Sequence, residues 1–184
     1  MNFFIFTHPR CRSLWLANLL TTNNSLCIHD TQGCLVKQTR DRLLNCGHYP
    51  YIGLSEPTPT VFRSIDTDVL ERSPKVVIQT SIDDSYQRTK KWIGDTPHRW
   101  GRDNAQRQAE ALAEIEKMPN CISVPFYSID DQAEIIFRHC LPGLVFDPIR
   151  AKLLRDMIIT VPYPKHADGF MVMHRRQLVA HSLV

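Results

Sequence analysis

Short apolar runs that alternate with helical patterns constrain the fold of this 184-residue chain more than any other feature. Residues 3–6 read Phe-Phe-Ile-Phe, and residues 75–79 read Lys-Val-Val-Ile-Gln. Runs this short and apolar are typical of strands buried on both faces, as in a parallel sheet. Further strands are predicted at 25–28, 49–53 and 121–126, and helices at 14–20, 32–46 and 103–117, with short helical turns at 66–71. The alternation predicts a three-layer α/β/α fold with a mainly parallel central sheet.

Capping residues mark the starts of three more helices. Ser81 or Asp83 is expected to cap a helix that runs to about residue 93, and Asp130 or Asp131 one that ends near residue 140. Asp147-Pro148 opens the last helix in the cap-then-proline order. The apolar residues expected to face the core on that last helix are Ile149, Leu153, Leu154 and Met157.

Proline and turn residues set the limits of the remaining segments. Pro50 has no N–H to donate, so the strand at 49–53 is expected at a sheet edge or at a strand start. Residues 54–59 contain two prolines and are predicted to be loop. Apolar segments flank residues 174–176, which predicts a β-hairpin over about 165–184. We expect one domain over residues 1–184, with this hairpin as an appendage.

Composition excludes several classes of protein. The formal net charge is only +3, so there is no specific signal for nucleic-acid binding. No stretch has the length of a transmembrane helix, and the apolar N-terminal run is too short for a signal peptide. The six cysteines include no CxxC pair, so no metal site is expected. We therefore expect a reduced, cytoplasmic protein without a membrane partner.

The segment after the first strand has the chemistry of an anion site. Pro9 ends the strand, and Ser13 is expected to cap the helix that follows, whose first turn carries unpaired N–H groups. Arg10 and Arg12 stand in the same turn, and guanidinium groups suit phosphate. The patterns GxxxxGK[ST] and GxGxxG are both absent. A Cys-based phosphatase loop would need Arg at position 17, which is Ala17.

Residues 9–16, Pro-Arg-Cys-Arg-Ser-Leu-Trp-Leu, resemble the 5′-phosphosulfate-binding loop of the P-loop sulfotransferases, above all the small sulfotransferase-like proteins of bacteriophages and bacteria. A second segment, 137–155, resembles a helix, a Pro-Gly break and a Phe-Asp-x-x-Arg helix start in those proteins. The likeness covers roughly residues 2–160. It implies a P-loop fold and the cofactor 3′-phosphoadenosine 5′-phosphosulfate (PAPS), whose product is 3′-phosphoadenosine 5′-phosphate (PAP). For a phage protein, the compartment would be the host cytoplasm.

The resemblance also implies roles for single residues. Arg10 would touch the transferring sulfonate, Ser13 would bind the 5′-phosphate, and Cys11 replaces a usual Ser. In the similar proteins, the strand that matches residues 75–79 ends in an Arg that binds the 3′-phosphate. This chain has Gln79 at that place, and Arg88 is the candidate to supply the positive charge. The residues implied in cofactor binding are His8, Pro9, Arg10, Cys11, Arg12, Ser13, Leu14, Trp15 and Arg88.

Three side chains are candidates for the general base that deprotonates the acceptor. His29 and Asp30 follow the second predicted strand, at the edge that faces the loop, and Glu56 lies in the predicted 53–58 loop. With Arg10 they form the expected catalytic set. The acceptor would be a hydroxyl or an amine. Two alternatives stay open, namely a P-loop nucleotide or small-molecule kinase, and a non-catalytic phage protein that binds a nucleotide or a host protein.

Overall fold

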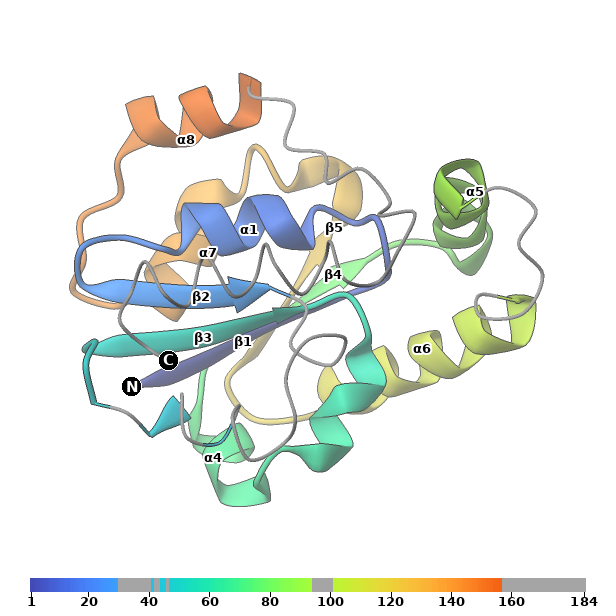
Figure 1. Cartoon of the computed structure of the whole chain (residues 1–184), viewed down its shortest axis with the longest axis horizontal. Helices are drawn as coiled ribbons and strands as arrows, with labels where there is room; N and C mark the ends of the chain where they lie inside the picture. The colour runs from blue at the N-terminus through green and yellow to red at the C-terminus, as the bar shows by residue number, and fades with distance from the viewer. Residues whose placement is uncertain (30–40, 42–43, 46, 94–100, 157–184) are drawn as a thin grey trace.

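The computed structural model describes residues 1–29, 41, 44–45, 47–93 and 101–156. Its centre is a sheet in which five described strands all run parallel, in the order β2-β3-β1-β4-β5 (Figure 1). The strands are β1 (Asn2–Thr7), β2 (Ser25–His29), β3 (Tyr51–Glu56), β4 (Lys75–Gln79) and β5 (Cys121–Pro125). The predicted α/β class with a parallel sheet is thereby confirmed.

Helices cover both faces of the sheet, which gives three layers (Figure 1). One face carries α1 (Ser13–Leu19), α7 (Ala133–Cys140) and α8 (Pro148–Asp156). The other face carries the 3-10 helix η1 (Pro59–Ser64), α4 (Thr67–Arg72) and α6 (Arg102–Ile115). Helix α5 (Ile82–Ile93) packs against α6, and a short 3-10 helix, η2 (Phe126–Ser128), follows β5.

Strand β1 forms the middle of both cores. Phe3 and Ile5 point to the α1 face, whereas Phe4 and Phe6 point to the α6 face, and all four are fully buried. This is why an uninterrupted apolar run was needed at residues 3–6. On β3, Gly53 lies opposite Phe3, and the Phe3 ring occupies the space that a Cβ at Gly53 would fill.

The carboxyl end of β1 is a point where the chain changes direction. The chain leaves β1 for α1 on one face, while the neighbouring strand β3 continues into η1 on the other face, and β4 continues into α5, which packs against α6. Connections that leave adjacent parallel strands toward opposite faces open a crevice at the carboxyl edge, where α/β proteins bind their ligands. The loop between β1 and α1 therefore begins at the position in this fold that is best suited to a ligand.

The structure agrees with one prediction about β3, that Pro50 stands at the strand start, and corrects another. The strand begins at Tyr51, so Pro50 precedes the ladder and its missing N–H costs no sheet hydrogen bond. This allows β3 to lie inside the sheet, paired with both β2 and β1. Residues 54–56, which were expected to be loop, complete the strand, because Leu54 fills the α6-side core. Glu56 consequently ends a buried strand.

The inward face of α8 also differs from the prediction. Ile149 and Leu153 are 73% and 61% exposed, and Ala151 is the buried residue of the helix. The orientation follows from Arg150, whose guanidinium donates hydrogen bonds to carbonyls at the end of α1. These acceptors are the carbonyl oxygens of Asn18, Leu19 and Thr21. Because Arg150 must face α1, its neighbours at 149 and 153 turn toward solvent.

Some caps are as predicted and others are not. The Asp84 N–H donates to Ser81 Oγ at 3.0 Å, and Asp147 accepts from the first N–H groups of α8. Helix α7 instead begins after Gln132, because Asp130 is used elsewhere. The predicted helix at 32–46 lies largely outside the described residues, as do Met157 and the predicted hairpin at 165–184.

Candidate functional site

The backbone between β1 and α1 is unusual. Arg10 and Arg12 have φ angles of 63° and 62°, in the left-handed region that residues other than glycine rarely adopt. Among the described non-glycine residues, only Asn120 shares this property. Left-handed residues that recur along a loop turn successive N–H groups toward one side and build a concave anion site. Strain of this kind persists where the surrounding structure enforces it, and it points to a function. We call residues 7–13 the β1–α1 loop.

Ser13 does not cap α1 as predicted. The N-cap residue is Arg12, which makes no side-chain capping bond, and Ser13 is the first helical residue. The Ser13 hydroxyl lies 2.9 Å from Nε2 of His29, and Ser55 Oγ donates to the Ser13 carbonyl oxygen at 2.7 Å. The left-handed turn at Arg12 rotates the Ser13 side chain inward, where it is nearly buried. Ser13 thus ties the loop to β2 and β3.

Two of the three side chains that the sequence suggests as general base lie at the carboxyl edge of the sheet. His29 ends β2 and touches the loop through Ser13. Glu56 ends β3 opposite Phe6 of β1, one residue before that strand ends, and is fully buried. Asp30 lies outside the described residues. The structure therefore brings His29 and Glu56 toward the loop from two adjacent strands.

The arginines near the loop have different surroundings. Arg12 forms an ion pair with Asp130, and its guanidinium lies 5.9 Å from the centre of the Trp15 ring. Burial lowers the pKa of Arg10. Arg88, on α5, donates from Nη2 to Thr80 Oγ1 at 2.6 Å and to Cys11 Sγ at 3.5 Å. The Arg88 guanidinium therefore lies against the loop itself, and Arg12 faces an acid.

His8 is a buried neutral imidazole at the start of the loop. Its side chain is almost fully buried, and burial followed by the nearby charge of Arg88 lowers its pKa to about 4. Within the described part of the chain, His8 Nδ1 and Arg88 Nε are buried nitrogens with no hydrogen-bond partner. Buried polar atoms without a partner are rare and require an explanation. Burial also raises the pKa of the Cys11 thiol to about 11, so this thiol stays protonated at neutral pH.

The other residues assigned by resemblance have simpler positions. Trp15 packs in the core beneath α1, and Leu14 is partly exposed. Gln79 donates to Glu116, which follows α6, at 2.8 Å. The described residues contain no group of three or more His, Cys, Asp and Glu side chains that could hold a metal ion. No described helix is both long and apolar enough to cross a membrane.

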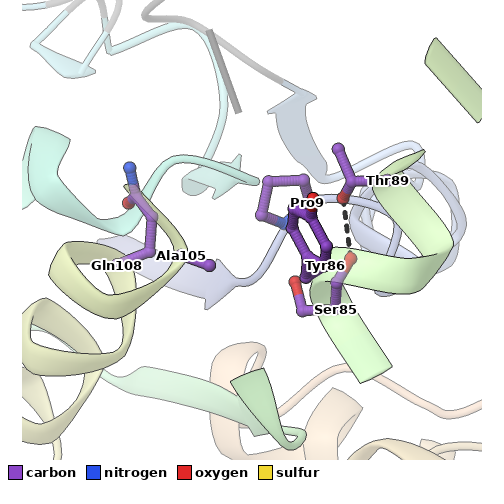
Figure 2. Close-up of a pocket in the computed structure, with 6 residues that line it drawn as sticks. All are labelled: Pro9, Ser85, Tyr86, Thr89, Ala105 and Gln108. Atoms are coloured by element: carbon purple, nitrogen blue, oxygen red, sulfur yellow. Dashed lines mark hydrogen bonds between the residues drawn. The ribbon is translucent and has the colours of Figure 1, made fainter. Parts of the chain in front are cut away.

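A small hollow, partly open to solvent, adjoins the loop (Figure 2). Pro9 lines it from the loop, Ser85, Tyr86 and Thr89 from α5, and Ala105 and Gln108 from α6. Figure 2 shows the two helices contributing from opposite sides, with Pro9 between them. Sequence reasoning missed this hollow. The available signal was the pair Ser85 and Thr89, two small polar residues four positions apart on the inner side of an amphipathic helix.

Comparisons with protein-family models, with curated proteins and with solved structures give no significant match.

Proposed function

We propose that this protein binds PAPS through the β1–α1 loop and transfers its sulfonate to a hydroxyl or amine acceptor. The observation that carries the proposal is the loop backbone, in which two arginines adopt left-handed conformations directly after the central strand. This geometry suits a phosphate or sulfonate, and the residue order 9–16 is similar to the 5′-phosphosulfate loop of P-loop sulfotransferases. A P-loop type of fold is part of the same proposal.

The roles of the residues follow from charge. The bound cofactor supplies an activated sulfonate, and attack by the acceptor leaves negative charge on the oxygen that bridges sulfur and phosphorus. In this proposal Arg10 and the loop N–H groups stabilise that charge, and preorganised donors of this kind usually supply the largest share of catalysis. His29 is the first candidate for the base, because its bond to Ser13 fixes the ring beside the loop. Glu56 is the second.

A calorimetric titration tests this proposal. The purified protein is titrated with PAP and, separately, with ATP and with ADP in the presence of magnesium. We expect micromolar binding of PAP alone, and we expect Arg10→Ala to abolish it while the circular dichroism spectrum is unchanged. Binding of ATP with magnesium in place of PAP would contradict the sulfotransferase proposal and favour a kinase. Absence of binding by all three ligands would leave a protein that works without a nucleotide.

A further inference from the structure

We propose that Arg88, together with His8, completes the anion site of the β1–α1 loop, so that both side chains contact the 5′-phosphate of the bound nucleotide. The sequence position of Arg88 suggested a different role, as a ligand of the remote 3′-phosphate. The inference rests on the proposed function for the identity of the ligand, while the anion site itself rests on the geometry of Arg88 and His8.

The position of Arg88 is fixed by three elements. Its guanidinium reaches Cys11 Sγ, in the loop between the two left-handed arginines, and Thr80 Oγ1, directly after β4. The same guanidinium lies 4.3 Å from the centre of the Phe126 ring, directly after β5. Arg88 is thus held at the carboxyl edge of the sheet, beside the loop, by neutral groups. A side chain in this position is close to whatever anion the loop N–H groups bind.

The charge of Arg88 lacks a counter-ion within the described residues. Its contacts are a hydroxyl, a thiol that stays protonated and an aromatic ring, whereas Arg12 has Asp130. Asp84, on the same helix, is an acid whose charge acts on Cys11. A half-buried cation without a counter-ion is costly, and an oxyanion beside it forms hydrogen bonds that are about twice as strong as neutral ones. Arg88 is therefore more available than Arg12 to bind an anion.

His8 supplies the second donor. Arg88 Nε and His8 Nδ1 are both buried and both lack a hydrogen-bond partner in the part of the chain that the structure describes. Burial and, after it, the charge of Arg88 lower the pKa of His8, so the two side chains interact electrostatically. A neutral imidazole can donate one N–H to an oxyanion without adding a second buried positive charge. Oxygens of a sulfonate or phosphate could accept from both nitrogens.

The experiment compares three nucleotides that differ in which phosphate they carry. PAP has both phosphates, 5′-AMP has only the one that the loop would bind, and 3′-AMP has only the remote one. Calorimetry measures their affinities for the wild type, for Arg88→Gln and for Lys91→Gln, which removes the same charge from an exposed position three residues away on α5. We expect Arg88→Gln to weaken PAP and 5′-AMP by the same factor, tenfold to a hundredfold, and Lys91→Gln to weaken neither by more than about twofold.

Each other outcome decides the matter. If Arg88→Gln weakens PAP and 3′-AMP but leaves 5′-AMP unchanged, Arg88 holds the remote phosphate and the inference is wrong. If the wild type binds no nucleotide, the PAPS proposal is wrong, and titration with sodium sulfate then tests the anion site alone. Sulfate binding that is lost in Arg88→Gln would support the anion site. Absence of sulfate binding would contradict it as well. If Arg88→Gln fails to fold, His8→Phe replaces it and is expected to show the same equal loss for PAP and 5′-AMP, several-fold in size.

Discussion

The buried imidazole of His8 makes the stability of this protein depend on pH in a calculable way. In the unfolded chain His8 titrates near 6.5, and in the folded protein burial and Arg88 lower its pKa to about 4. Between these two values the unfolded chain binds a proton that the folded protein does not, so the free energy of unfolding falls as the pH drops. The stability that the folded protein keeps while His8 is neutral in both states is fully present above pH 6.5. Between pH 7 and pH 5, the protonation of His8 in the unfolded chain alone lowers the free energy of unfolding by about 2 kcal/mol.

The assay is urea denaturation of the wild type and of His8→Gln at pH 7 and pH 5, followed by tryptophan fluorescence. We expect the wild type to lose about 2 kcal/mol more than the variant over this interval, because Gln has no proton to bind. His48→Gln, at an exposed position, is the matched control and should lose as much as the wild type. An equal loss in wild type and His8→Gln would refute the account of a buried, neutral His8.

Three further substitutions test other parts of the structure. Arg150→Met removes the hydrogen bonds from α8 to the end of α1 and should lower the free energy of unfolding by about 2 kcal/mol, or the melting temperature by roughly 4–8 °C, as measured by calorimetry. The control Arg155→Met, on the same helix, should cost under about 0.5 kcal/mol, and equal effects of the two variants would contradict this role of Arg150. Gly53→Ala places a Cβ 2.0 Å from a ring carbon of Phe3 and should cost about 3 kcal/mol or prevent folding, so a wild-type melting temperature would show the strand pairing to be wrong. Asp130→Asn releases Arg12 and should tighten PAP binding several-fold by titration; unchanged affinity would mean that Arg12 stays away from the ligand.

The strands could be predicted because strands buried on both faces need uninterrupted apolar residues, which are visible in the sequence. Residues 3–6 and 76–78 are apolar without interruption, since both of their faces are covered. The extent of β3 was less accessible to this reasoning. Pro50 allowed either a sheet edge or a strand start, and only the pairing of β3 with β1 and β2 decides between the two.

The loop was predictable in place but not in detail. The order Pro-Arg-Cys-Arg-Ser marks a turn with cations, yet no local rule predicts that Arg10 and Arg12 adopt left-handed backbones. Contacts between distant segments were invisible too. Arg12 pairs with Asp130, and Arg88 meets Cys11 across 77 positions in the chain. These contacts decide which cation is available to a ligand, and they depend on the whole fold.

The most direct test of the account is a crystal structure of the protein with PAP bound. We predict the 5′-phosphate within hydrogen-bond distance of the backbone N–H groups of Arg10, Arg12 and Ser13 and of the Arg88 guanidinium, with the loop keeping its two left-handed arginines. A 5′-phosphate bound elsewhere, for example in the hollow between Pro9 and helices α5 and α6, would contradict the claim that this loop is the anion site.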